Sequence, residues 1–135
     1  MPAKAFFDTN VLIYSVAEDD ARSETVEALL ASGGVISVHV LNEFVAVARR
    51  KLEMPWPDIN EALSAIRILC PSPIAITIDT HDAARRIAEQ YGYHIYDALV
   101  AAAALQANCD TLYTEDLQDG QVIDDQLTMR NPFTS

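Results

Sequence analysis

The feature that most constrains the fold is a regular alternation of strand-like and helix-like segments along the whole chain. Short apolar or β-branched runs predict strands, whereas apolar residues that recur every three or four positions predict helices. The predicted strands cover residues 5–7, 35–38, 74–78 and 110–113, with a weaker one at 127–130. The predicted helices cover residues 9–14, 23–30, 41–51, 59–69, 81–90 and 97–107. Such an alternation is typical of an α/β fold.

Strands that alternate with helices are joined by right-handed crossovers, which make the strands parallel and cover both faces of the sheet with helices. We therefore expect a central parallel sheet of four to five strands with helices on both faces. The 135 residues contain no linker, repeat or low-complexity segment, so residues 1–135 are predicted to form a single domain. In such sheets, binding sites form outside the carboxyl ends of the strands.

The composition excludes several classes of protein. The longest apolar run, residues 98–105, is far shorter than the roughly 20 residues that a membrane-spanning helix needs. The amino-terminal residues lack the long hydrophobic region of a signal peptide, so we expect a cytoplasmic protein with no membrane association. Cys70 and Cys109 do not have the spacing of a zinc site or a disulfide framework, and they are predicted to be buried free thiols.

Four acidic residues are predicted to meet at the carboxyl edge of the sheet. Asp8 directly follows the first strand, and Asp116 follows the strand at 110–113. Asp97 lies near the start of the alanine-rich helix, and Glu43 lies in the first half of the helix that leaves the second strand. Taken singly, each acid has an ordinary explanation as a helix cap, a first-turn acid or a solvated residue. The apolar sequence around Asp8 and Asp97 favours burial instead.

A group of four carboxylates requires a counter-charge. Two like charges about 4 Å apart repel by roughly 4 kcal/mol at an effective dielectric constant of 20, and no lysine or arginine occurs within six residues after Asp97. A hard divalent cation, Mg²⁺ or Mn²⁺, neutralises such a group through oxygen ligands. His39, His81 and His94 are not clustered as zinc ligands, and we expect ordinary surface or core roles for them. The chain also lacks Gly-rich phosphate loops and the GxSxG motif of serine hydrolases.

The motifs around these acids resemble those of PIN-domain ribonucleases. In chain order they are FDTNVLIY at 7–14, Ser37 with Glu43, YDALVAAA at 96–103 and LYTED at 112–116. Their order and spacing match the family across nearly the full chain, and within the family they most resemble the toxins of VapBC-type toxin–antitoxin pairs. The resemblance implies a three-layer PIN-like fold, and an acidic pocket that uses Mg²⁺ or Mn²⁺ to hydrolyse RNA phosphodiester bonds endonucleolytically.

The resemblance also implies roles for individual residues. Asp8, Glu43, Asp97 and Asp116 match the positions of the catalytic and metal-binding acids of the family. The polar neighbours that orient these acids are matched by Asn10, Ser37 and Thr114.

Three nearby acids compete for the fourth position. The family pattern places the acid two residues after the threonine, here Thr114, which favours Asp116 over Glu115 and Asp119. We expect Glu115 and Asp119 to face solvent.

The expected partners are RNA, a cognate antitoxin and a second copy of the chain. In the VapBC-type arrangement, the carboxyl-terminal segment of an antitoxin occupies the groove, and homodimers are common. The net charge of −11 suits a basic partner segment but repels RNA. Basic residues are grouped at 49–51 and 85–86, and we hypothesise that residues 49–51 line the path of the RNA.

Two other functions are compatible with parts of this pattern. A catalytically silent PIN-like module that binds RNA or another protein would retain the fold but lose acids, whereas all four acidic positions are filled here. A phosphohydrolase that acts on small phosphoesters would carry a second Asp two residues after Asp8, whereas position 10 is Asn.

Overall fold

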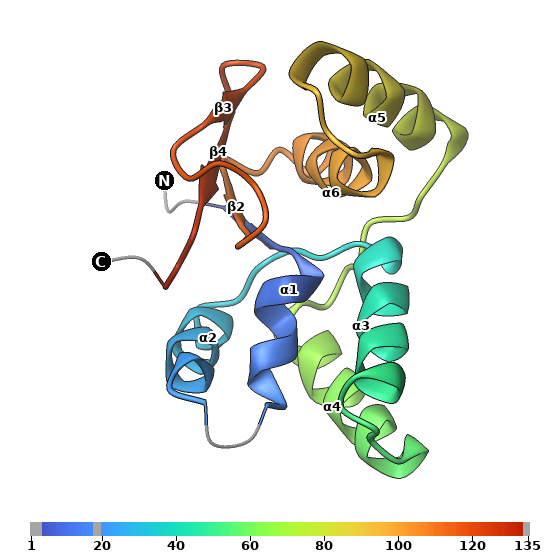
Figure 1. The fold of residues 1–135 in the computed structure, drawn as a ribbon, viewed down its shortest axis with the longest axis vertical. Coiled ribbons are helices and arrows are strands. Elements are labelled where there is room, and N and C mark those ends of the chain that lie inside the picture. Colours follow the sequence, from blue (N-terminus) through green and yellow to red (C-terminus); the bar gives the residue numbers. More distant parts are fainter. Residues whose placement is uncertain (1–3, 18–19, 134–135) are drawn as a thin grey trace.

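A four-stranded sheet organises the chain in a computed structural model that describes residues 4–17 and 20–133 (Figure 1). Its strands, in the order β1-β2-β4-β3, are β1 (Ala5–Phe7), β2 (Thr111–Tyr113), β4 (Leu127–Arg130) and β3 (Val122–Ile123). β1 pairs with β2, and β2 with β4, in parallel. The carboxyl ends of β1 and β2 therefore lie at the same edge of the sheet.

The predicted α/β fold is confirmed, although one edge strand runs against the other three. β3 pairs with β4 in antiparallel orientation. The turn between them contains Asp124 and Asp125, both of which have a positive φ that aspartate tolerates better than most residues. A strand of two residues has too short a pattern to be predicted from sequence.

Two of the predicted strands contribute only isolated bridges to the sheet. Val35 bridges Phe6, and Ser37 bridges Ile74, in both cases in parallel. The β-branched run at 35–38 ends early because the Ser37 hydroxyl accepts a hydrogen bond from Val40 N and caps helix α3 (Val38–Arg50). The run at 74–78 ends in the same way.

A reciprocal capping box starts helix α5 (Ile78–Tyr91). The Thr77 hydroxyl accepts from Thr80 N at 3.3 Å, and Thr80 Oγ1 accepts from Thr77 N at 3.1 Å. The helix therefore begins three residues before the predicted position 81. It ends, as predicted, at Gly92, which adopts a left-handed conformation with φ +76°.

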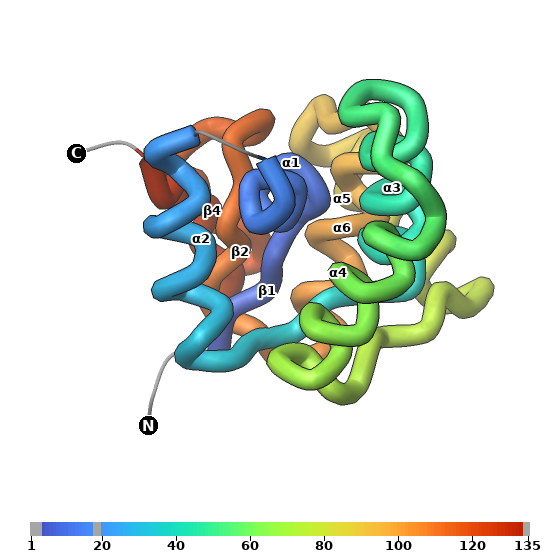
Figure 2. Tube along the Cα trace, turned by 90° about the horizontal axis from the view of Figure 1, so that it is seen from below, coloured from blue at the N-terminus to red at the C-terminus, as the bar shows by residue number. Residues whose placement is uncertain are grey.

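The remaining helices surround the sheet and one another. They are α1 (Thr9–Leu12), the 3₁₀ turn η1 (Ile13–Ser15), α2 (Arg22–Ala31), α4 (Trp56–Leu69) and α6 (Ile95–Gln106). Figure 1 shows α5 and α6 together beside the sheet and α1 to α4 gathered below it. In the view of Figure 2, β2, β4 and α2 lie on one side of α1, and α3 to α6 lie on the other. Helix α1 thus occupies the centre of the molecule, directly after Asp8.

The core joins the sheet to the helices. Phe6, Leu112 and Met129 on the strands are fully buried, as are the alanines at positions 98 and 101–104 of α6. Small side chains let α5 approach α6 closely, and Thr80 Oγ1 of α5 donates to Gln106 Oε1 at 2.8 Å.

Both cysteines, Cys70 and Cys109, are buried and free, as predicted. No helix in the described residues is long and apolar enough to cross a membrane.

Candidate functional site

The carboxyl ends of β1 and β2 bring together residues that are more than one hundred positions apart. Asp8 follows β1, and its backbone N–H donates to Tyr113 O at the end of β2. A pocket of about 480 Å³ opens at this edge, and its lining includes Asp8, Glu43, Asp97 and Asp116. All four acids that the sequence singles out therefore face one cavity.

Asp8 is the buried centre of this site, with only 5% of its surface exposed. Its carboxylate accepts hydrogen bonds from Thr9 N at 2.7 Å, from Thr114 Oγ1 at 2.9 Å and from Asn10 Nδ2 at 3.4 Å. Burial raises the pKa of Asp8 to about 7, against the lowering effect of these hydrogen bonds, and the charges of Glu43 and Asp97 raise it further. A cation beside this buried carboxylate would stabilise its charged form.

Asn10 and Thr114 tie the two strand ends together. Asn10 Nδ2 donates to Thr114 Oγ1 at 3.1 Å, and Asn10 Oδ1 accepts from Glu115 N at 3.1 Å. Thr114 Oγ1 also accepts from Asp116 N at 3.2 Å, which holds the loop that carries Asp116 against Asp8. These contacts give Asn10 and Thr114 an orienting position in the pocket.

Glu43 reaches the pocket from helix α3. Its Oε1 lies 3.0 Å from His39 Nε2, one helical turn earlier, and 3.3 Å from the Thr9 hydroxyl that donates to it. The contact with His39 holds the pKa of Glu43 below its usual range despite partial burial. Ser37 does not line the pocket; as the cap of α3, it positions the helix that carries Glu43.

Asp97 lies in the first turn of α6 and is half-buried. Burial raises the pKa of Asp97, and the neighbouring charge of Asp116 raises it further, followed by that of Glu43. Nearby His94 and His39 act in the opposite direction. Asp97 and Asp8 thus share an environment in which negative charges repel one another.

The donor set of the pocket fits a hard divalent cation. Four carboxylates supply only oxygen, and two of them have a raised pKa that a cation would lower. Within residues 4–17 and 20–133, no three His, Cys, Asp or Glu side chains are already grouped tightly enough to enclose a metal ion. Mg²⁺ tolerates such an open arrangement, because it keeps several waters and binds through one or two carboxylates together with substrate phosphates.

Sequence reasoning misplaced one residue of the pocket and missed one contact beside it. Glu115 was expected to face solvent, but it lines the pocket because Asn10 holds its backbone N–H, and its carboxylate lies 3.7 Å from Arg22 Nη1. His39 is not part of the pocket lining, but its contact with Glu43 was not predicted. The i, i+4 spacing of His39 and Glu43 on one helix is the sequence signal that would have found this pair. Asp119 lies outside the pocket lining, and its carboxylate accepts from Asn131 N.

Several basic side chains in the groups at 49–51 and 85–86 already contact other residues of the chain. Arg49 donates to Met54 O, and its guanidinium lies 5.2 Å from the centre of the Trp56 ring. The arginines at 85 and 86 form ion pairs with Asp82 and Asp124. From the groups at 49–51 and 85–86, Lys51 alone lines the pocket.

Comparison with known proteins identifies the fold. Residues 5–118 match the family model described as PIN domain. VapC20 from Mycobacterium tuberculosis, a sarcin–ricin loop cleaving toxin, is 21% identical with a TM-score of 0.62, over 84% of this chain and 90% of that one. A chain of VapBC2 from Rickettsia felis, bound to a DNA fragment from its promoter, is 21% identical with a TM-score of 0.64, over 94% of this chain and 98% of that one. No curated protein matches the sequence significantly.

Proposed function

This chain belongs to the PIN domain family, and we propose that it is a divalent-metal-dependent endoribonuclease, the toxin of a type II toxin–antitoxin pair. The observation that carries the proposal is the convergence of Asp8, Glu43, Asp97 and Asp116 on one pocket at the carboxyl edge of parallel strands. Among residues 4–17 and 20–133, Asp8 has no cation as a hydrogen-bond partner although it is almost fully buried. An arrangement that raises the pKa of its own acids is typical of a functional site.

The metal, Mg²⁺ or Mn²⁺, would lie among these same four carboxylates, with one or two of them as direct ligands and water between the ion and the others. When bound, such an ion lowers the pKa of a water molecule and neutralises charge that builds up on a phosphodiester during in-line displacement. The site requires no nucleophile from a side chain, and it contains no cysteine or serine among its lining residues.

The other residues of the chain hold the acids in place. Thr9 N and the Thr114 hydroxyl fix the carboxylate of Asp8, and Thr9 Oγ1 together with His39 fixes that of Glu43. Asn10, in the helix that Asp8 caps, is hydrogen-bonded to the loop after β2 that carries Asp116, and so links the two segments that supply these acids. Such preorganisation reduces the reorganisation needed when charge develops on the substrate.

The toxin role is supported by two similar folds and by charge. VapC20 is described as a toxin, and VapBC2, which carries the name of the VapBC-type pairs that the motifs resemble, as bound to a DNA fragment from its promoter. A protein with a net charge of −11 is complementary to a basic segment of a partner, and such complementarity accelerates association. We therefore propose a cognate antitoxin with a basic segment that enters the acidic pocket, and a homodimeric toxin.

The test is cleavage of single-stranded RNA by the purified protein with Mg²⁺ or Mn²⁺, followed by mapping of the ends. We expect 5′-phosphate and 3′-hydroxyl termini, loss of cleavage with a chelator, and loss of cleavage in Asp97→Asn. Asp79→Asn is the matched control, because Asp79 is also a first-turn acid of a helix but lies outside the pocket. Calorimetric titration with Mn²⁺ separates the nuclease from a silent module: a wild-type protein that neither binds Mn²⁺ nor cleaves RNA contradicts the proposal.

A further inference from the structure

The pocket has two parts that differ in charge. The first part contains the four carboxylates of the proposed catalytic site. The second part extends along α1, η1 and the end of α3, where Ile13, Val47 and Leu52 supply an apolar wall. Lys51 lines this second part, and it is the only lysine or arginine among the described residues that line the pocket.

The acids of the second part already have a cation. Asp20 lies 3.0 Å from Arg22 Nη2, and Glu115 lies 3.7 Å from Arg22 Nη1. Arg22 is itself fixed over the ring of Tyr14, 4.3 Å from its centre. Arg22 lies outside the pocket lining, but when it is counted with Lys51 against these two acids the second part is formally neutral, whereas the first part carries four negative charges. A polyanion that enters the pocket is therefore repelled least at Lys51.

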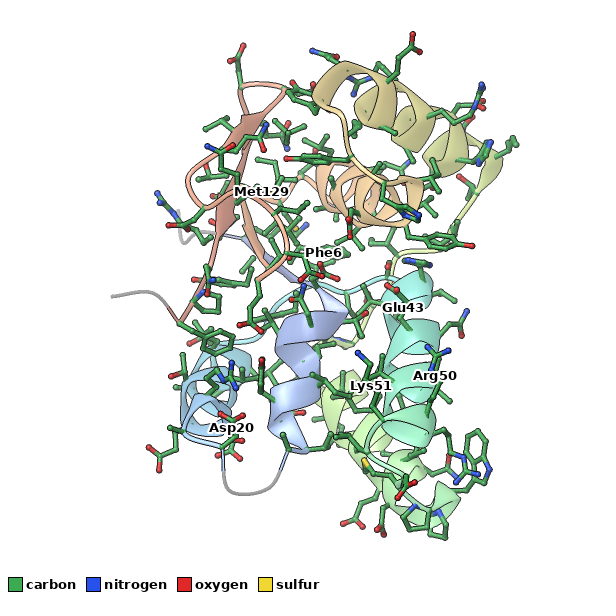
Figure 3. All side chains as sticks on the ribbon, viewed as in Figure 1. Phe6, Asp20, Glu43, Arg50, Lys51 and Met129 are labelled. Carbon is green, nitrogen blue, oxygen red and sulfur yellow. The ribbon has the colours of Figure 1, made fainter. Side chains whose placement is uncertain are left out.

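Helix geometry places Lys51 in line with the proposed catalytic acids. Glu43 and Val47 on α3 and Lys51, the C-cap that follows the helix in a helical conformation, are spaced four residues apart, which puts them on one face. Eight residues of α-helix rise by about 12 Å, so Lys51 lies farther along the same pocket than the carboxylates do. Figure 3 shows Glu43 and Lys51 on the side of α3 that faces α1, and Arg50 on the side that faces away.

The ammonium group of Lys51 is available to a ligand. Among the described residues, Lys51 forms no ion pair and no side-chain hydrogen bond. Its neighbour Arg49, in contrast, is occupied by Met54 O and Trp56. An unpaired cation in the wall of an acidic pocket has the chemistry of a contact for an anionic group of the substrate.

We infer that Lys51 binds a backbone phosphate of the RNA next to the one that is cleaved, with the attached nucleoside against the apolar wall of Ile13, Val47 and Leu52. The inference rests on the proposed nuclease function. It makes Lys51 a binding residue that holds the strand across the carboxylates, and it explains how a chain with a net charge of −11 retains a polyanionic substrate.

The test compares Lys51→Met with Arg50→Met. Both variants lose one positive charge at the carboxyl end of α3 and retain an unbranched stem, so helix-dipole and net-charge effects are matched. Binding of a fluorescent, phosphorothioate-linked single-stranded RNA that resists cleavage is measured by anisotropy over a series of salt concentrations with Mg²⁺. Circular dichroism establishes that both variants are folded.

For Lys51→Met we expect roughly two- to fivefold weaker binding, as for a partly exposed ion contact. The slope of log affinity against log salt should fall in magnitude by about 0.7, the value for one phosphate of a single strand. Cleavage of ordinary RNA should show a raised KM with kcat retained. Arg50→Met should bind as the wild type does, and Lys51→Arg should recover most of the affinity.

Equal affinities in the two methionine variants, whether both unchanged or both reduced, would overturn the inference, because the effect would then be absent or due to net charge. Equal RNA affinities would overturn the inference even if Lys51→Met changed the binding of a protein partner. Failure of the proposed function looks different: the wild-type protein then does not cleave RNA. A wild type that cleaves normally alongside an unaffected Lys51→Met contradicts only the role of Lys51.

Discussion

Side chains are buried both at the interface between α5 and α6 and at the carboxyl edge of β1 and β2. The buried side chains are mainly apolar in the first region and include charged groups in the second. In α6 the alanines at 98 and 101–104 are fully buried, and Thr80 supplies a polar link to Gln106. At the strand edge, Asp8 is almost as deeply buried, next to the charges of Glu43 and Asp97. The apolar side chains of the helix pair stabilise the fold. The charges at the strand edge destabilise it, but they can bind a cation. We therefore expect substitutions in the helix pair to lower stability and leave activity unchanged. Substitution of a buried acid at the strand edge should abolish activity and raise stability.

The largest effect on stability is expected in the helix pair. Ile87→Ala removes a fully buried side chain of α5 and should lower the free energy of unfolding by about 2–5 kcal/mol. Urea denaturation measures the loss, with Glu89→Ala, an exposed position on the same helix, as the control. Cleavage per folded molecule should stay unchanged. A specific loss of activity in folded Ile87→Ala would remove the distinction between the two regions.

Asp8→Asn should have the opposite effect. A pKa raised from 3.8 to about 7 corresponds to roughly 4 kcal/mol of destabilisation by the ionised group above neutral pH. Some of this gain is lost, because the amide nitrogen of asparagine cannot accept the hydrogen bonds made to the carboxylate oxygen that it replaces. We therefore expect a gain in the free energy of unfolding of about 1–3 kcal/mol. Thermal denaturation in the presence of a chelator measures the gain, and RNA cleavage by this variant should be abolished. A destabilised Asp8→Asn would show that the hydrogen bonds to the carboxylate outweigh the cost of burying its charge.

The stability of the wild-type protein should also depend on pH through Asp8. Because the folded state has the higher pKa, it binds the proton more tightly than the unfolded state between about pH 4 and 7. The contribution of Asp8 is therefore most favourable at low pH and falls as the pH rises through this range, by at most about 1.4 kcal/mol per pH unit. Subtracting the pH profile of Asp8→Asn from that of the wild type isolates this contribution. A flat difference would contradict the raised pKa.

The smallest effects compare two helix caps. Ser37→Ala and Thr77→Ala each remove the N-cap of a helix, and each should cost about 1 kcal/mol of stability. Their effects on RNA cleavage should differ, because α3 carries Glu43 into the pocket whereas α5 carries none of the four acids. We expect Ser37→Ala to cleave several-fold more slowly, and Thr77→Ala to cleave as the wild type does. Equal rates in the two variants would assign Ser37 a purely structural role.

Sequence reasoning located the helices and the edge of the sheet at which the acids meet. These features are local, since periodicity and caps fix the helices and a strand end fixes Asp8. Sequence reasoning failed where the same few residues favour both a strand and a helix start. The run at 35–38 has strand propensity, but the Ser37 cap starts a helix there. The two-residue strand β3 has no periodicity to detect.

The lining of the pocket was only partly predictable for a similar reason. Motif spacing singled out Asp116 but not Glu115, whose place depends on a hydrogen bond from its backbone to Asn10, 105 positions away. Likewise, nothing in the run at 49–51 distinguishes Lys51 from Arg50. The face of α3 that meets α1 decides between them, and that is a property of helix packing rather than of composition.

The pairing of β1 with β2 has a consequence for synthesis of the chain. Asp8 emerges from the ribosome early, but its partner Thr114 lies 106 positions later, and Asn10 lies 104 positions before the same threonine. Every nascent chain that ends before Thr111 lacks β2 and the contacts that Asp8 and Asn10 make with the loop after it. The proposed nuclease therefore lacks a complete pocket throughout most of its own translation.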